Sequence, residues 1–414
     1  MQTKKPESGK LQFRIDIILT VIFIAAIFFM GVMTVIEKGE GIYFAAVSYK
    51  NLGNFVEDPF NCSHWDRMEA RVKSVDSYLT SNVYGADALG EVNSTFQYAL
   101  GKQMVTTGGS SMVRLNTGHL YDLQNYIPMD KAAENILDMK AMVPDGVPFL
   151  FVYEHPTLYS DEMMPAGYDV LDYLPEMAEE ISEKMAAAGV NMIDSREVLT
   201  SSGLKLEDYL YYTDQHWSTR AAIVMAQRIA QELSRATGVN LHPEKLDISQ
   251  FDTQTHSKLF LGKYGQRIGT RNVDPDDIIT YSPKYPTNIH RYTNYLGEIT
   301  DLTGPFEESV MRPRYLKPLD GKTYNTSAYF DYGLTENYDL LENPDGADLT
   351  ILLLKDSYSA PIGAFLSLTA GKIASIDLRR SDVPLDELIR KYRPDAVVVA
   401  YSMQMLRDDN YEFQ

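Results

Sequence analysis

A run of 20 residues without charge, from Ile17 to Ile36, is the strongest constraint on what this chain can form. As a helix with a rise of ~1.5 Å per residue, the run is roughly 30 Å long, which is the thickness of a bilayer's hydrocarbon core. The alternative is a cleaved signal peptide, whose apolar region has about 7–15 residues and whose cleavage site needs small residues. Because this run is longer and ends with Val35 and Ile36, we expect an uncleaved transmembrane anchor over residues 15–36.

Charges beside the anchor predict its orientation. The basic residues before it are Lys4, Lys5, Lys10 and Arg14. Basic flanks stay in the cytoplasm, so residues 1–14 should form a cytoplasmic N-terminus. The rest of the chain should then be extracytoplasmic, beginning with a juxtamembrane segment over residues 37–84.

Composition narrows the classes of function. The net charge of −19 offers no basic excess to replace counterions on phosphates, so nucleic acid is not an expected partner. Cys62 is the only cysteine, which leaves neither an intrachain disulfide nor a cysteine-based zinc site. The seven histidines lack paired ligand spacing, and no phosphate-binding glycine motif is present. We therefore expect no metal and no cofactor.

Residues 85–236 alternate in the manner of an α/β fold. The segment from Phe96 to Val105 is predicted to be a strand, and Val147 to Glu154 is a strongly apolar strand. Tyr173 to Ala188 is amphipathic and predicts a helix. These features indicate the first part of an α/β domain.

Periodicity fades over residues 237–345, where Tyr, Pro, Asn, Asp and Gly are common. This composition predicts a β-rich or irregular insertion. Its tyrosines, including those from Tyr324 to Tyr332, could line a groove for carbohydrate, because rings stack on sugar faces. Ordinary loop packing is the alternative. The α/β pattern resumes over residues 346–414, with three strands separated by helices: Leu349–Lys355, Lys372–Leu378 and Asp395–Tyr401.

The first motif with chemical meaning is Thr213-Asp214-Gln215-His216-Trp217. Asp214 and His216 can be presented by one loop, because Ser218 is a good N-cap for a helix that starts at Thr219. An imidazole held by a carboxylate is the base that activates a serine hydroxyl. We expect Trp217 to pack under this loop and set the angle of the imidazole, with stacking on a sugar as the alternative.

The second motif is Leu354-Lys355-Asp356-Ser357-Tyr358, which ends an apolar run. Ser357 stands where a buried strand turns into a helix. That corner exposes a side chain and supplies helix N-terminal amides for an oxyanion. Taken alone, an Asp-Ser pair after a strand is more often a helix cap than a nucleophile. The combination of the two motifs favours a nucleophile.

Other polar residues follow the neighbouring strands. Parallel strands bind substrate at their carboxyl ends, so Asp377, Arg379 and Tyr401 could face the same crevice as Ser357. An ordinary salt-bridged strand end is the alternative reading of Asp377 and Arg379.

Together these features resemble the SGNH-hydrolase-like proteins of the DHHW and alginate O-acetyltransferase type. The resemblance covers the layout of residues 85–414 and is specific at the two motifs. It implies a flavodoxin-like, three-layer parallel sheet, with Asp214 as the orienting acid, His216 as the base and Ser357 as the nucleophile. The chain departs from the pattern at Gln215, where the family name implies His, and at Lys355, where the Gly-Asp-Ser form has glycine.

The resemblance also implies a function. We expect O-acetylation or deacetylation of a polysaccharide outside the membrane through an acyl-Ser357 intermediate, with a multi-pass membrane acyltransferase as the acetyl donor. Gly108 and Ser110 are the expected further oxyanion or substrate contacts. Two alternatives stay open. One is a secreted carbohydrate esterase. The other is a non-catalytic carbohydrate-binding or assembly protein, which the residues Gln215 and Lys355 favour.

Overall fold

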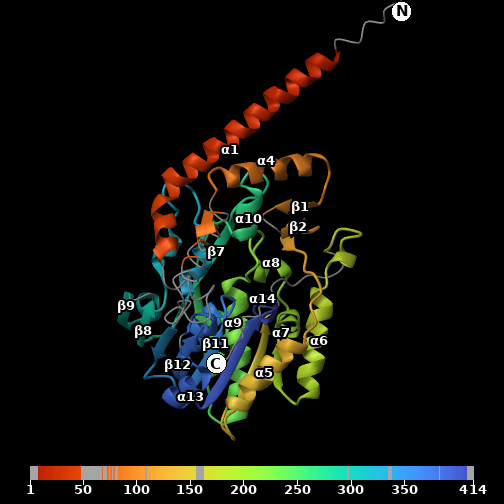
Figure 1. Ribbon diagram of the computed structural model, residues 1–414. Coiled ribbons are helices and arrows are strands. Elements are labelled where there is room, and N and C mark those ends of the chain that lie inside the picture. The colour runs from red at the N-terminus through yellow and green to blue at the C-terminus, as the bar shows by residue number, and fades with distance from the viewer. Residues whose placement is uncertain are drawn as a thin grey trace, which may run out of the picture. The chain divides into compact units, whose positions relative to one another are not determined.

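The computed structural model describes residues 8–47, 68, 72–73, 75–76, 78–79, 83–107, 110–154, 163–295, 298–333, 338–381 and 383–407 (Figure 1). The chain divides into two compact units, Met1–Asn93 and Ser94–Gln414.

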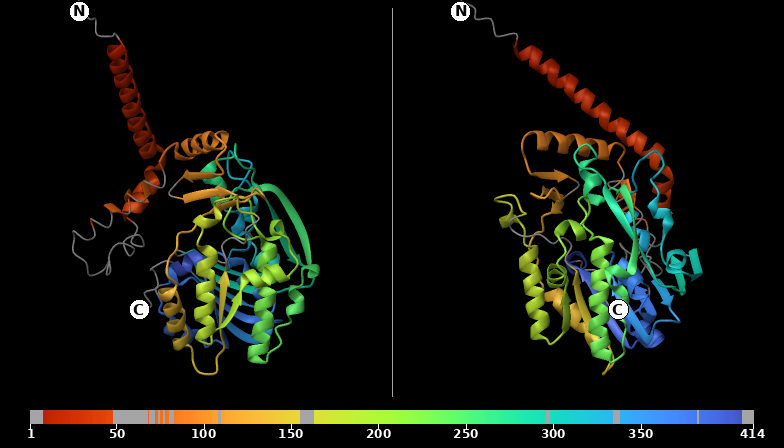
Figure 2. Two further views of the ribbon diagram at one scale, coloured as in Figure 1. Left: turned by 90° about the vertical axis from the view of Figure 1, so that its right-hand side faces the viewer. Right: turned by 180° about the vertical axis from the view of Figure 1, so that it is seen from behind.

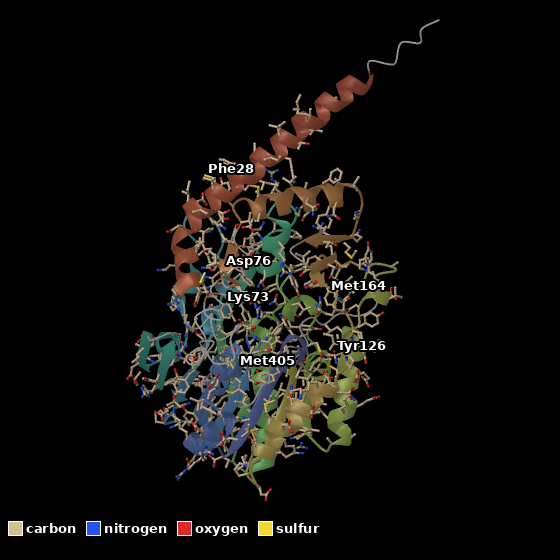
Figure 3. All side chains as sticks on the ribbon, viewed as in Figure 1. Phe28, Lys73, Asp76, Tyr126, Met164 and Met405 are labelled. Atoms are coloured by element: carbon tan, nitrogen blue, oxygen red, sulfur yellow. The ribbon has the colours of Figure 1, made fainter. Side chains whose placement is uncertain are left out.

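The first unit is dominated by the helix α1, Ser8–Val47. Within α1, Ile17–Gly39 is long and apolar enough to cross a membrane by length and composition, as a membrane anchor or a signal sequence would be. Apolar side chains such as Phe28 point outward from the helix (Figure 3). Thr34 is buried, and its hydroxyl accepts a hydrogen bond of 2.9 Å from the backbone N–H of Tyr84.

The second unit is built on a sheet that has eight strands among the described residues. Five neighbouring strands are parallel, in the spatial order β5 (Asn191–Asp194), β4 (Phe149–Glu154), β13 (Ala396–Ser402), β11 (Ala347–Lys355) and β12 (Ala370–Ile376). Three antiparallel strands continue the sheet beyond β12, namely β10 (Tyr338–Glu342), β8 (Ile289–Tyr295) and β9 (Glu298–Gly304).

Helices cover both faces of the sheet and make three layers (Figure 2). One face packs against α9 (Thr219–Thr237) and α12 (Ala360–Leu366), and the other packs against α5 (Asp130–Met142), α6 (Leu174–Ala187) and α13 (Leu385–Tyr392). The central strand β13 is buried along its whole length, as expected for a parallel strand covered on both faces. The helix α9 begins as predicted, because the Ser218 hydroxyl accepts the N–H of Ala221.

One predicted strand is wrong. Most of the segment from Phe96 to Val105 belongs to or follows the helix α4, Ala86–Ala99, and only its end enters β1, Met104–Thr107. The physical reason is the spacing of the apolar side chains at Leu89, Val92 and Phe96, which fits one face of a helix and not the alternation of a strand. The strand β1 pairs with β2 (Ser110–Arg114), which pairs with β3 (Leu120–Asp122).

Residues 237–345 contain strands as well as short helices. The antiparallel pair β6 (Phe251–Phe260) and β7 (Asp276–Pro283) forms a separate ribbon, whereas β8, β9 and β10 extend the central sheet. The short helix α11 (Phe306–Ser309) follows β9.

Two further short helices lie earlier in the chain. The helix α8 (Leu206–Tyr209) precedes α9. The helix α7 (Ser195–Ser201) follows β5 directly.

A buried ion pair joins the antiparallel part of the sheet. The Arg291 guanidinium on β8 donates to the Asp339 carboxylate on β10 at 2.7 and 2.9 Å, and to the carbonyl of Val310 at 2.8 Å. Both charged side chains are almost fully buried, at 3% and 0% exposed. A buried pair of this kind depends on both partners, because either one alone would leave an uncompensated charge in the core.

Replacing Asp339 with Ala should therefore lower the free energy of unfolding by roughly 3–5 kcal/mol. Denaturant unfolding of the purified chain measures the change. Asp386→Ala is the matched control, since it breaks the exposed Arg390–Asp386 pair and should cost less than about 1 kcal/mol. Equal effects of the two substitutions would contradict the importance of the buried pair.

Candidate functional site

The loop before α9 carries Asp214 and His216. Hydrogen bonds to Asp276 on β7 hold the start of this loop in place. The Asp276 carboxylate accepts the backbone N–H groups of Tyr212 (2.7 Å) and Thr213 (2.9 Å), and the hydroxyl of Thr213 (2.5 Å). Burial raises the pKa of Asp276 to about 7, against these three hydrogen bonds, which favour the charged form. A residue more than sixty positions downstream thus fixes the start of the loop.

Asp214 is buried and accepts three hydrogen bonds. Its Oδ1 accepts from His216 Nδ1 at 2.5 Å and from the backbone N–H of His216 at 3.0 Å, and its Oδ2 accepts from the backbone N–H of Lys263 at 2.6 Å. Burial alone would raise the pKa of Asp214, but the imidazole charge of His216 and these hydrogen bonds bring it below its usual value. Asp214 is therefore a carboxylate at neutral pH and fixes the orientation of the His216 ring.

Gly262 lies directly against Asp214. A Cβ atom at position 262 would stand 2.2 Å from the Cβ of Asp214 and 2.6 Å from the carbonyl oxygen of Thr213. Only glycine permits this approach, which brings the start of the short helix α10, Lys263–Ile268, close enough for the Lys263 N–H to reach the carboxylate.

Ser357 follows β11 and meets His216 across the sheet edge. His216 Nε2 lies 3.0 Å from Ser357 Oγ, so Asp214, His216 and Ser357 form one continuous hydrogen-bonded chain. In such a hydrogen-bonded series the Asp214 carboxylate fixes the tautomer of the imidazole, and His216 Nε2 can accept the serine proton.

The turn that carries Ser357 is fixed by the residue before it. Asp356 accepts the N–H of Tyr358 at 2.8 Å, as a local cap does. Its other oxygen accepts the N–H and the hydroxyl of Ser402 at the end of β13, at 2.8 and 2.6 Å. Asp356 thereby ties the serine turn to the neighbouring strand.

Aromatic side chains enclose the imidazole. The His216 ring stacks on Tyr329 with centroids 4.1 Å apart, and Tyr358 lies on it at 4.6 Å. Trp217 is fully buried, and its indole N–H donates to the carbonyl of Tyr358 at 3.1 Å. Since its ring is buried, Trp217 packs within the core beside the loop and offers no face to a sugar.

A cavity of about 750 Å³ lies beside this chain of residues. It reaches the site through Gln215 and Tyr358, the neighbours of His216 and Ser357 in sequence. Other lining residues are mostly polar, among them Ser110, Gln124, Asn125, Lys263, Arg267 and Gln404. Gln404 belongs to the helix α14, Met403–Arg407, which also carries the buried Met405 (Figure 3). A polar cavity of this size fits a ligand rich in hydroxyl groups.

Of the other predicted site residues, some line the cavity and some lie away from it. Ser110 lines the cavity and accepts a hydrogen bond of 2.5 Å from Arg267, whereas Gly108 lies outside the described residues. Asp377 and Arg379 bind each other at 2.9 and 2.6 Å, which is the salt-bridged strand end given as the alternative. Neither of them lines the cavity.

Tyr401 requires a correction. It is fully buried in the core on the α5 and α6 side of the sheet, so it does not face the crevice. The reason is its strand, because β13 lies in the centre of the sheet and both of its faces are covered. Strand ends expose side chains only where no helix or loop packs over them.

Sequence reasoning did not find three supporting residues. Asp276 and Gly262 carried no local signal, because their contacts depend on how β7 and α10 pack against the loop. Tyr329 belongs to the tyrosines for which a sugar groove and ordinary loop packing were both open, and it is buried against His216. The abundance of tyrosine in residues 237–345 was a signal that aromatic rings gather there, but it did not show which ring would stack on the imidazole.

The three-layer α/β sheet, with Ser357 at a strand end and an Asp-x-His loop before a helix, has the SGNH-hydrolase-like fold. Residues 150–282 match the family model of the SGNH hydrolase-like domain of acetyltransferase AlgX. The predicted resemblance and fold class are thereby confirmed. No curated protein sequence matches the chain.

Solved structures share the fold. A DHHW family protein from Eubacterium siraeum aligns with 75% of this chain and 96% of its own, at 19% identity and a TM-score of 0.58. Bacillus cereus PatB1 with a sulfonyl adduct aligns with 74% of this chain and 99% of its own, at 16% identity and a TM-score of 0.59. At these identities the comparison establishes a common fold.

Gly262→Ala should disturb the Asp214–His216 contact, because the added methyl group overlaps Asp214. We expect the rate at which a sulfonyl fluoride labels the chain to fall by about 10²-fold, since a displacement of ~1 Å at such a site can cost that much. Gly304→Ala is the control, because its nearest contact would be an ordinary 3.5 Å. Unchanged labelling of Gly262→Ala would refute the proposed constraint.

Asp276 should make stability depend on pH. Its folded pKa of about 7 exceeds the usual 3.8, so between these values the folded chain holds a proton that the unfolded chain has lost. This stabilising contribution is complete below pH 3.8 and disappears as the pH rises to about 7. The stability of the wild type relative to Asp276→Asn should thus fall by roughly 3–4 kcal/mol over that range. Denaturant unfolding of both proteins at pH 4.5 and 7.5 tests this. A stability of the wild type relative to Asp276→Asn that is greater at pH 7.5 than at pH 4.5 would contradict it.

Proposed function

We propose that this protein is a membrane-anchored, extracytoplasmic serine acyltransferase that O-acetylates a cell-surface or exported polysaccharide. The observation that carries the proposal is the continuous contact from Asp214 through His216 to Ser357 Oγ. The match of residues 150–282 to an acetyltransferase domain supports the same reaction class.

The proposed reaction has two steps. His216 Nε2 removes the proton of Ser357, and Ser357 Oγ attacks the carbonyl carbon of an acetyl ester. The resulting oxyanion is assigned to the backbone N–H of Ser357 and to donors near Gly108 and Ser110. Collapse breaks the bond to the donor's alkoxide, which takes the proton from His216, and leaves acetyl-Ser357.

In the second step, an acceptor hydroxyl gives its proton to His216 and attacks the acetyl-Ser357 carbonyl. Ser357 leaves, recovers the proton and is free again. Asp214 stabilises the imidazolium in both steps, and its lowered pKa keeps it charged. A sugar hydroxyl as acceptor gives transfer, whereas water gives deacetylation.

The cavity supports a carbohydrate acceptor. Amide and hydroxyl side chains such as Gln124, Asn125 and Ser110 can bind sugar hydroxyls, and a bound glycan in this space would displace competing water. A multi-pass membrane acyltransferase is proposed as the source of the acetyl group, on the strength of the family resemblance. The apolar span Ile17–Gly39 would keep the domain near such a donor.

Two departures from the family motif favoured a non-catalytic reading, and neither interrupts the hydrogen-bonded chain. The carbonyl of Gln215 accepts the Tyr358 hydroxyl at 2.8 Å, so this residue still fixes the loop. Lys355 is buried, and burial lowers its pKa, while the carboxylates of Asp377 and Asp339 oppose this change.

Ser357→Ala and His216→Ala should each abolish covalent labelling by a sulfonyl fluoride and turnover of a chromogenic acetyl ester. Removal of a member of such a triad typically costs ~10⁴-fold or more in rate. Intact mass with the ester as donor should detect acetyl on Ser357 in the wild type. Ser201→Ala is the control, because this exposed hydroxyl at the end of α7 donates only to the carbonyl of Val198 and does not line the cavity.

Thermal unfolding shows whether each variant is folded. Full activity in a folded Ser357→Ala variant would exclude the proposed mechanism. Glycan binding without acetyl or sulfonyl labelling of the wild type would instead support the carbohydrate-binding alternative, and turnover with water alone would support an esterase.

A further inference from the structure

The helix α4 carries an exposed apolar stripe. Leu89, Val92, Phe96 and Leu100 are separated by three or four residues, which places them on one face of the helix and of the turn that follows it. Their exposed fractions are 56%, 60%, 63% and 61%. A continuous patch of this kind on a folded protein marks a surface that contacts a partner.

The opposite face of α4 is already used. Ser94 is fully buried, and Tyr98 packs against the Arg114 guanidinium on β2 at 4.0 Å. Phe96 follows Ser94 by two residues, or about 200° around the helix, so the apolar stripe points away from these contacts. The packing of α4 on its own domain therefore explains one face of the helix and leaves the other exposed.

We propose that the apolar face of α4 lies in the membrane–water interface and that its partner is lipid. The proposal rests on the membrane anchor of the proposed function, which holds the domain close to a bilayer and makes even weak interfacial binding effective. Interfacial helices bury such a face roughly 5–10 Å deep.

The charges on α4 define the kind of lipid. Its charged residues, Asp87 and Glu91, are acidic, and no basic side chain lies within the helix. Attraction to anionic headgroups would need basic residues on the polar face, so binding here depends on apolar burial. Zwitterionic lipid should be sufficient.

This contact would give the domain a defined height above the membrane. The helix α4 leads into β1 and β2, and Met104 and Ser110 on these strands line the cavity. A helix fixed in the interface would therefore also fix how the cavity is presented to a glycan or a membrane-bound donor.

The test uses the full chain in phosphatidylcholine nanodiscs containing a lipid with a photoactivatable diazirine near its glycerol backbone. Mass spectrometry maps the cross-linked peptides. We expect cross-links on α1 and on α4, but none on β9, where Ile299 is equally exposed at 63%. Cross-links on α1 without any on α4 would overturn the α4 proposal and leave the anchor intact. Absence of cross-links on α1 would count against the anchor instead.

The double variant Leu89→Ser/Phe96→Ser should reduce cross-linking of α4 at least about tenfold, because it removes two large apolar side chains from the lipid contact. Cross-linking of α1 and the midpoint of thermal unfolding should not change, since both substituted side chains are exposed. Ile299→Ser is the matched control and should leave α4 labelling intact. Unchanged α4 labelling in the double variant, or shielding of the face only when a partner protein is reconstituted alongside, would overturn the proposal.

Discussion

The buried carboxylate of Asp214 is the interaction on which the rest of the site depends. Hydrogen bonds must compensate the cost of removing a charge from water, and Asp214 accepts them from His216 and from the Lys263 backbone. The hydrogen bond from the Lys263 backbone requires α10 to approach Asp214 so closely that position 262 must be glycine. The orientation of the imidazole therefore depends on a segment about fifty residues away in the chain.

A layer of polar and charged side chains extends from this site along the carboxyl edge of the sheet. Glu154 ends β4 and accepts the Ser359 hydroxyl at 3.0 Å, while burial and the negative charge of Asp356 raise its pKa well above the usual value. Lys355 ends β11, and Asp377 directly follows β12. Such a layer cannot be assembled one residue at a time, because each buried group needs its neighbour as a partner. This explains how a lysine occupies the position where the family motif has glycine.

Much of the architecture was predictable. The apolar runs of β4, β11 and β13 and the amphipathic α6 and α9 appeared in the sequence as periodic patterns, because burial on two faces or on one side constrains composition locally. The failure at Phe96 to Val105 came from reading apolar residues at helical spacing as a strand. Tyr401 was misplaced because sequence position at a strand end does not tell whether the strand is central or at an edge.

The sequence by itself determined the apolar N-terminal helix, the α/β alternation and the residues of the two motifs, since each is encoded in a short stretch of chain. The tertiary structure alone decided that Ser357 meets His216, which is 141 positions away, and that Asp276, Gly262 and Tyr329 support them. It also decided that one face of α4 is covered and the other exposed. These are contacts between distant segments, and their geometry follows from strand order and packing, which no local pattern specifies.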